Sequence, residues 1–168
     1  MNEHKVPAIV FTGQQDPEIR AHFITHDLVD YVFKAGAYSI HYICALINRV
    51  LFNHEFTILV VDDSRSALLT LEKLLSNQGF KIICAKNAAE CMMAMKKKPD
   101  MVILDQYLPD GIGHDVCRNI RSIYSDPILQ IIGVSSKGDH DTAAFFLKNG
   151  GDDFLLRPFN PEEFTRRI

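Results

Sequence analysis

Residues 56–168 alternate short apolar segments with amphipathic stretches, and this alternation limits the fold more than any other feature of the chain. The apolar segments have the length of β-strands and lie at 56–61, 81–85, 101–105, 128–134 and 153–156. After the first of them, Leu68, Leu71 and Leu75 recur at the spacing of a helix face. Strands that alternate with helices form a parallel sheet with helices on both faces. The sequence therefore predicts a doubly wound α/β fold with a five-stranded parallel sheet.

Two further helices have recognisable beginnings. The segment at 87–90, Asn-Ala-Ala-Glu, has the form of a capping box, so a helix is expected to begin there. The turn residues Pro-Asp-Gly at 109–111 are expected to lead into another helix from Gly113 to Tyr124. Both helices fill the intervals between predicted strands, as the doubly wound fold requires.

Polar residues gather where the predicted strands end. Asp62 and Asp63 end the first strand, Asp105 ends the third, Ser135 ends the fourth and Arg157 follows the fifth. Ligands of a doubly wound sheet bind at this edge, outside the carboxyl ends of the strands. Carboxylates brought together there repel by about 4 kcal/mol per pair at about 4 Å and an effective dielectric constant near 20, so they need a cation. Oxygen ligands with room for water suit Mg²⁺.

Four motifs carry this edge of the sheet, and they are specific in combination. They are Ile58–Ser64, Val102–Asp105 with Leu108–Gly111, Ile131–Ser135, and Asp153–Phe159. Through them, residues 57–168 resemble a CheY-like response-regulator receiver domain of bacterial two-component signalling. The resemblance implies a flavodoxin-like sheet with the strand order 2-1-3-4-5.

The resemblance also implies the chemistry of the acidic cluster. Asp105 is expected to be the phosphoacceptor, and a sensor histidine kinase or a phosphotransfer protein is expected to be the phosphodonor. The carboxylates of Asp62, Asp63 and Asp105, with the backbone carbonyl of Tyr107, are expected to bind Mg²⁺. The domain would catalyse its own phosphorylation and dephosphorylation, without otherwise being an enzyme, and would signal by changing conformation.

The phosphoryl-stabilising and switch residues follow from the same resemblance. Ser135 is expected to hydrogen-bond the phosphoryl oxygens, and Phe154 matches the aromatic switch position. Arg157 stands where the family carries a nearly invariant lysine, and a cis peptide bond is expected between Arg157 and Pro158. Arginine keeps the charge, but its planar fork is not equivalent to an ammonium group. Two interpretations therefore stay open: a phosphorylated receiver with altered coupling, or a pseudo-receiver that acts as a protein-interaction or dimerisation module.

An internal repeat makes residues 1–55 interpretable. Four pairs of residues share one offset of 123 positions (135 − 12 in the first): Thr12 and Ser135, Asp16 and Asp139, Asp30 and Asp153, and Lys34 and Arg157. Residues 1–55 are therefore expected to be the C-terminal half of a first receiver, from its fourth strand to its fifth helix. That helix would place Ile40, Ile43, Ile47 and Val50 on one face.

Residues 56–168 would then be a second receiver with a truncated last helix. We expect the chain to be part of a tandem-receiver protein, and the resemblance points to a diguanylate cyclase output outside this chain. Unpaired strands of the half receiver favour association, so a homodimer is a further expectation.

Charge and hydropathy exclude other classes of partner. With 18 basic and 21 acidic residues, the chain has a formal charge of −3 and no overall basic field for nucleic acid. It contains no uncharged apolar run of about 18 residues, so no contact with a membrane is expected. The four cysteines form no CxxC pair, which favours buried thiols in a reducing compartment and a cytoplasmic location.

Overall fold

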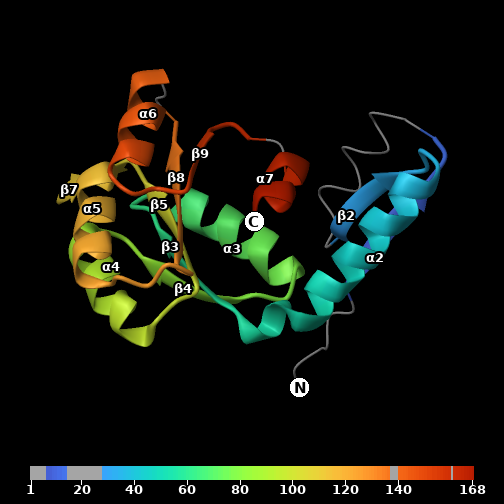
Figure 1. The fold of residues 1–168 in the computed structure, drawn as a ribbon, viewed down its shortest axis with the longest axis horizontal. Coiled ribbons are helices and arrows are strands. Elements are labelled where there is room, and N and C mark those ends of the chain that lie inside the picture. Colours follow the sequence, from blue (N-terminus) through green and yellow to red (C-terminus); the bar gives the residue numbers. More distant parts are fainter. Residues whose placement is uncertain (1–6, 15–27, 137–139, 160) are drawn as a thin grey trace.

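The computed structural model describes residues 7–14, 28–136, 140–159 and 161–168 (Figure 1). These residues form a large α/β unit and a small unit of two strands and one helix, which lie side by side in Figure 1. Within the described ranges, no helix is both long enough and apolar enough to cross a membrane.

The large unit contains the predicted five-stranded sheet. Its strands follow the order β4-β3-β5-β8-β9, and every neighbouring pair is parallel. Their bounds are Thr57–Val61 for β3, Lys81–Ala85 for β4, Met101–Asp105 for β5, Gln130–Ser135 for β8 and Asp153–Leu156 for β9. In chain order this is the expected 2-1-3-4-5 arrangement. The doubly wound α/β prediction is confirmed.

The fourth strand differs from its prediction at both ends. It was expected at 128–134, but β8 begins at Gln130 and continues through Ser135. The backbone N–H of Ile128 donates to Asp126 Oδ1 at 2.9 Å, a local bond typical of a turn, and the Ile128 side chain is exposed. Ile128 therefore belongs to the loop before the strand, although its apolar side chain suited a strand.

Helices cover both faces of the sheet (Figure 1). They are α3 Arg65–Asn77, α4 Ala88–Ala94, α5 Gly113–Ile123, α6 His140–Lys148 and α7 Pro161–Arg167, with the short helix η2 Met95–Lys97 after α4. A two-residue pair, β6 Tyr107–Leu108 and β7 Gly111–Ile112, joins β5 to α5. The predicted N-cap at Asn87 is confirmed, because its Oδ1 accepts from Glu90 N at 2.7 Å; Glu90 Oε2 accepts from the backbone N–H of Lys86, the residue before the cap.

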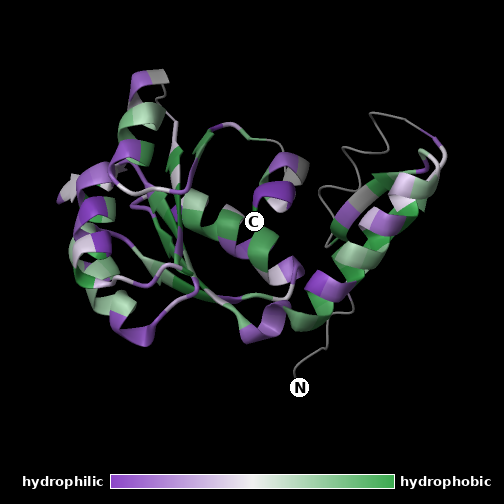
Figure 2. Cartoon of the chain, viewed as in Figure 1, coloured by the Kyte–Doolittle hydropathy of each residue, from purple (hydrophilic) through white to green (hydrophobic). Residues whose placement is uncertain are grey.

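The core has one layer on each face of the sheet because successive strand residues point in opposite directions. In β3, Leu59 and Val61 contact the layer under α4 and α5, whereas Ile58 and Val60 contact the layer under α3 and α7. Both sets are buried. This double burial explains the continuous apolar runs in the sequence, and Figure 2 shows the hydrophobic colour along the central strands.

The small unit repeats the strand pairing of β8 and β9. Its strands β1 Ala8–Thr12 and β2 Leu28–Phe33 are parallel, and Thr12 pairs with Phe33 as Ser135 pairs with Leu156. The next residues also match: Lys34 N donates to Thr12 O at 2.8 Å, and Arg157 N donates to Ser135 O at 2.7 Å. The sequence offset of 123 thus also relates the two strand registers. The Asp16–Asp139 pair lies outside the described residues.

The helix of the small unit, α2 Ala37–Phe52, is oriented differently from the expectation. Leu46 is buried on β2, and Ile43 and Val50 are partly buried beside it. Ile40 and Ile47 are 59% and 45% exposed, so the expected face is wrong for these two residues. Apolar residues lie on several sides of α2, and periodicity alone therefore did not select the buried side.

Polar contacts join α2, and Asn53 directly after it, to the large unit. Both terminal nitrogens of Arg49 donate to the carbonyl of Thr165 in α7, each at 3.2 Å. Asn53 Nδ2 donates to the carbonyl of Gln78 at the end of α3, and Gln78 Nε2 donates to Thr165 Oγ1 at 3.2 Å. Asn53, Gln78 and Thr165 are all buried, so the small unit packs against the end of α3 and against α7.

Candidate functional site

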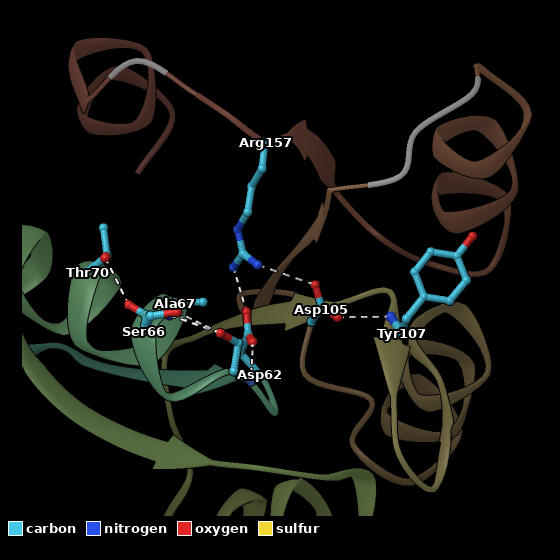
Figure 3. A network of polar contacts seen from close by, with 8 residues as sticks. Asp62, Ser66, Ala67, Thr70, Asp105, Tyr107 and Arg157 are labelled. Carbon is cyan, nitrogen blue, oxygen red and sulfur yellow. Dashed lines mark hydrogen bonds and ion pairs between the residues drawn. The ribbon is translucent and has the colours of Figure 1, made fainter.

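Two buried carboxylates face each other across the carboxyl ends of β3 and β5 (Figure 3). Asp62 directly follows β3, and its Oδ1 accepts from the backbone N–H of Ser64 at 2.8 Å. Asp105 ends β5, and its Oδ2 accepts from the backbone N–H of Tyr107 at 3.0 Å. Backbone donors therefore fix one oxygen of each carboxylate and leave the other directed into the site. Asp63, the third predicted member, is exposed.

Arg157 lies between these two carboxylates. It follows β9, and its peptide bond to Pro158 is cis, as the family resemblance implied. Its Nη2 is 2.6 Å from Asp62 Oδ2, and its Nη1 is 3.6 Å from Asp105 Oδ1. Figure 3 shows the guanidinium pointing from its loop into the gap between the two acids. A planar fork with two terminal nitrogens can span both partners, which a single ammonium nitrogen cannot do in the same way.

The Asp105 carboxyl group has a raised pKa. Burial is the main cause and raises this pKa to about 6; the N–H of Tyr107 and the Arg157 cation oppose the shift, while Asp62 and Asp63 add to it. Burial and neighbouring negative charge both disfavour the ionised carboxylate. The ionised form of Asp105 is therefore less favourable in this site than in water.

Ser135 and Phe154 belong to β8 and β9, the two strands beyond β5 in the sheet. Ser135 is fully buried at the end of β8, and its carbonyl accepts the backbone N–H of Arg157. Phe154 is buried in β9 and packs on Phe146 of α6, with ring centroids 5.4 Å apart. A Cβ atom at Gly133 would lie only 2.5 Å from Phe154 Cδ2, so glycine in β8 gives the ring its place in the core.

The sequence did not indicate the contacts of Gln106, the residue after Asp105. Its side chain is buried, and its Nε2 lies 2.8 Å from Nδ1 of His114. The beginning of α5 is held close to the acceptor strand as well, because a Cβ atom at Gly113 would lie 2.5 Å from the carbonyl oxygen of Asp105. The Pro-Asp-Gly turn and the following glycine were the only sequence signals for this close approach.

The donor set fits Mg²⁺ in its chemistry, but the arrangement differs from a formed metal site. Asp62, Asp63, Asp105 and the Tyr107 carbonyl offer only oxygen atoms, which hard divalent cations prefer. In the part of the chain that the structure describes, however, no three His, Cys, Asp or Glu side chains are grouped to hold a metal ion. Asp62 and Asp105 share the Arg157 cation instead.

The sequence of residues 58–168 matches the family model of the response regulator receiver domain. The chain belongs to the response regulator receiver family. Among curated relatives, the probable transcriptional regulator ycf27 of Pyropia yezoensis is 34% identical over 117 residues, and that of Porphyridium aerugineum is 35% identical over 112 residues. These matches cover 69% and 66% of this chain but 47% and 45% of the relatives. The chain thus spans about half the length of these relatives.

Solved structures support the same assignment. A probable two-component system response regulator/GGDEF domain protein is 31% identical, with a TM-score of 0.88 over 96% of this receiver chain and 67% of that protein. The CheX–CheY–BeF3–Mg²⁺ complex from Borrelia burgdorferi contains a chain that is 26% identical, with a TM-score of 0.62 over 67% of this chain and 85% of that one. The first match extends over nearly the whole chain and therefore includes the small unit.

Proposed function

We propose that this receiver accepts a phosphoryl group on Asp105 from a histidine kinase or a phosphotransfer protein. The observation that carries the proposal is the placement of Asp105 at the end of β5, with Oδ2 held by Tyr107 N–H and Oδ1 facing a cation. Because the Tyr107 N–H fixes the carboxylate, its Oδ1 is positioned to attack phosphorus. A bond forms between the carboxylate oxygen and phosphorus, the bond from phosphorus to the donor histidine nitrogen breaks, and that nitrogen takes a proton.

Positioning and positive charge supply most of the catalysis in phosphoryl transfer. Arg157 would direct its guanidinium at the phosphoryl oxygens, and the Ser135 hydroxyl would donate to another of them. Asp62, Asp63, Asp105 and the Tyr107 carbonyl would hold Mg²⁺, which supplies positive charge beside the phosphoryl group when bound. The buried position of Ser135 favours this assignment because a phosphoryl group there would have few competing water contacts.

The signal would leave through β8, β9 and their helices. Phe154 in β9 packs on Phe146 of α6. A change at Ser135 or Arg157 that moves β9 would therefore also move α6. We further propose that a diguanylate cyclase output lies outside this chain, supported by the response regulator/GGDEF relative. The matching register of β1–β2 and β8–β9 supports residues 1–55 as the second half of another receiver.

A second candidate function is a pseudo-receiver that binds protein partners without phosphorylation. The ion pair of Arg157 with Asp62 favours it, because this cation already neutralises part of the acidic site. Homodimer formation through the small unit stays a prediction, as do a cytoplasmic location and the absence of nucleic acid and membrane contacts.

Fluorine NMR with beryllofluoride, a phosphoryl mimic, distinguishes the two functions. In the presence of Mg²⁺, we expect bound fluoride resonances for the wild-type chain and none for Asp105→Asn. The variant keeps the size of the side chain and removes the carboxylate oxygen that the adduct needs. Absence of bound resonances from a folded wild-type chain would favour the pseudo-receiver.

A further inference from the structure

Each oxygen of the Asp62 side chain already has a partner. Oδ1 accepts from Ser64 N at 2.8 Å, and Oδ2 lies 2.6 Å from Arg157 Nη2. Arg157 Nη1 is also 3.6 Å from Asp105 Oδ1. The guanidinium thus lies between the two buried carboxylates that the proposed function assigns to a metal ion.

We propose that Arg157 is a tethered competitor of Mg²⁺, which must release Asp62 before a divalent ion can bind. The inference deepens the proposed function and rests on its assignment of Asp62 and Asp105. It makes Arg157 the residue that sets the metal requirement of this receiver. Arginine in place of the family's lysine would therefore raise the Mg²⁺ concentration that is needed to occupy the site.

The distances make joint occupancy unfavourable. Mg²⁺ binds carboxylate oxygens at about 2.1 Å and demands a regular octahedral shell. An ion at Asp62 Oδ2 would share this oxygen with Arg157 Nη2, which is 2.6 Å away, and the two cations would repel each other. A charge-assisted bond from arginine to a carboxylate is among the stronger hydrogen bonds in proteins, so its loss opposes metal binding.

Burial identifies the partner that moves. The Asp62 side chain is 2% exposed, whereas the Arg157 side chain is 21% exposed. Asp62 is also held by the backbone of Ser64 at the beginning of α3. Arg157 therefore has a route toward solvent, or toward an arriving phosphoryl group, while Asp62 stays in place.

Calorimetric titration with MgCl₂ tests the proposal at constant ionic strength. We compare the wild-type chain with Arg157→Lys, which keeps the charge but removes the fork. Arg167→Lys is the matched control, since Arg167 pairs with Asp153 and Glu163 outside the site. Arg157→Lys is expected to bind Mg²⁺ at least about tenfold more tightly than the wild type, and the control is expected to match the wild type.

NMR of the arginine Nε–H groups of the wild-type chain gives a second readout that needs no variant. Saturation with Mg²⁺ is expected to shift the Arg157 signal and to leave that of Arg167 in place. Equal Mg²⁺ affinities of wild type and Arg157→Lys, an unmoved Arg157 signal at saturation, or no Mg²⁺ binding by either chain would each overturn the inference. The beryllofluoride adduct is measured separately. If the adduct forms but wild type and Arg157→Lys bind Mg²⁺ equally, only the competition is rejected. If Arg157→Lys binds Mg²⁺ more tightly but no adduct forms, only phosphorylation of Asp105 is rejected.

Discussion

Replacement of Arg157 by methionine is expected to lower the free energy of unfolding by about 2–4 kcal/mol in metal-free buffer at neutral pH. Asp62 would lose the cation at 2.6 Å while its own side chain stays 2% exposed. Removal of one member of a buried ion pair is costly because the remaining charge loses its counter-ion and is still shielded from water; the Ser64 N–H alone does not replace the cation. Urea denaturation followed by circular dichroism measures the loss.

Two matched variants separate this effect from lost packing. Asp62→Asn combined with Arg157→Met removes both charges and is expected to recover most of the stability. Arg167→Met breaks exposed ion pairs and is expected to cost no more than about 1 kcal/mol. If Arg157→Met is as stable as Arg167→Met, the ion pair with Asp62 does not have the strength that its geometry indicates.

Asp105→Asn is expected to stabilise the metal-free chain by about 1–2 kcal/mol at neutral pH. Burial raises the pKa of Asp105 from 3.8 to about 6, so the folded chain holds a proton on this group that the unfolded chain releases at lower pH. Stability therefore falls as the pH rises through the interval between these two pKa values. Asparagine has no charge to bury and avoids this loss.

The pH dependence of the stability difference between wild type and Asp105→Asn tests this prediction. Thermal unfolding of wild type and Asp105→Asn from about pH 4 to about pH 8 should show stabilities that are similar at the acidic end, separate as the pH rises toward about 6, and differ by a constant amount above it. Both chains are measured with chelator, because a bound divalent ion would neutralise the carboxylate. A constant difference between the variants at every pH would show that Asp105 does not titrate as its surroundings indicate.

Most of the sheet could be predicted because its strands are buried on both faces. The apolar runs at 81–85, 101–105 and 153–156 coincide with β4, β5 and β9. Errors arose where an apolar side chain is exposed. Ile128 extends the run before β8 but lies in a turn, and Ile40 and Ile47 lie on the exposed side of α2. The sequence shows that a side chain is apolar, but it does not show whether another element of the fold packs against that side chain and buries it.

That Asp62, Asp105 and Arg157 lie together could be predicted from the sequence, but the bonds between them could not. The strand ends placed Asp62, Asp105, Ser135 and Arg157 together, since parallel strands end at one edge. That Arg157 would bond Asp62 at 2.6 Å, rather than only face Asp105, depends on side-chain reach across the gap between strands. The contact of Gln106 with His114 likewise comes from the close approach of α5 and had no pattern in the sequence.

The most direct test of phosphoacceptance is the intact mass of the chain after incubation with acetyl phosphate and saturating Mg²⁺. Phosphorylation of Asp105 predicts the addition of one phosphoryl group to the wild-type chain, loss of the added mass in hydroxylamine, and no addition to Asp105→Asn. An unchanged wild-type mass at saturating Mg²⁺, or equal addition to Asp105→Asn, would contradict the assignment of Asp105 as the phosphoacceptor.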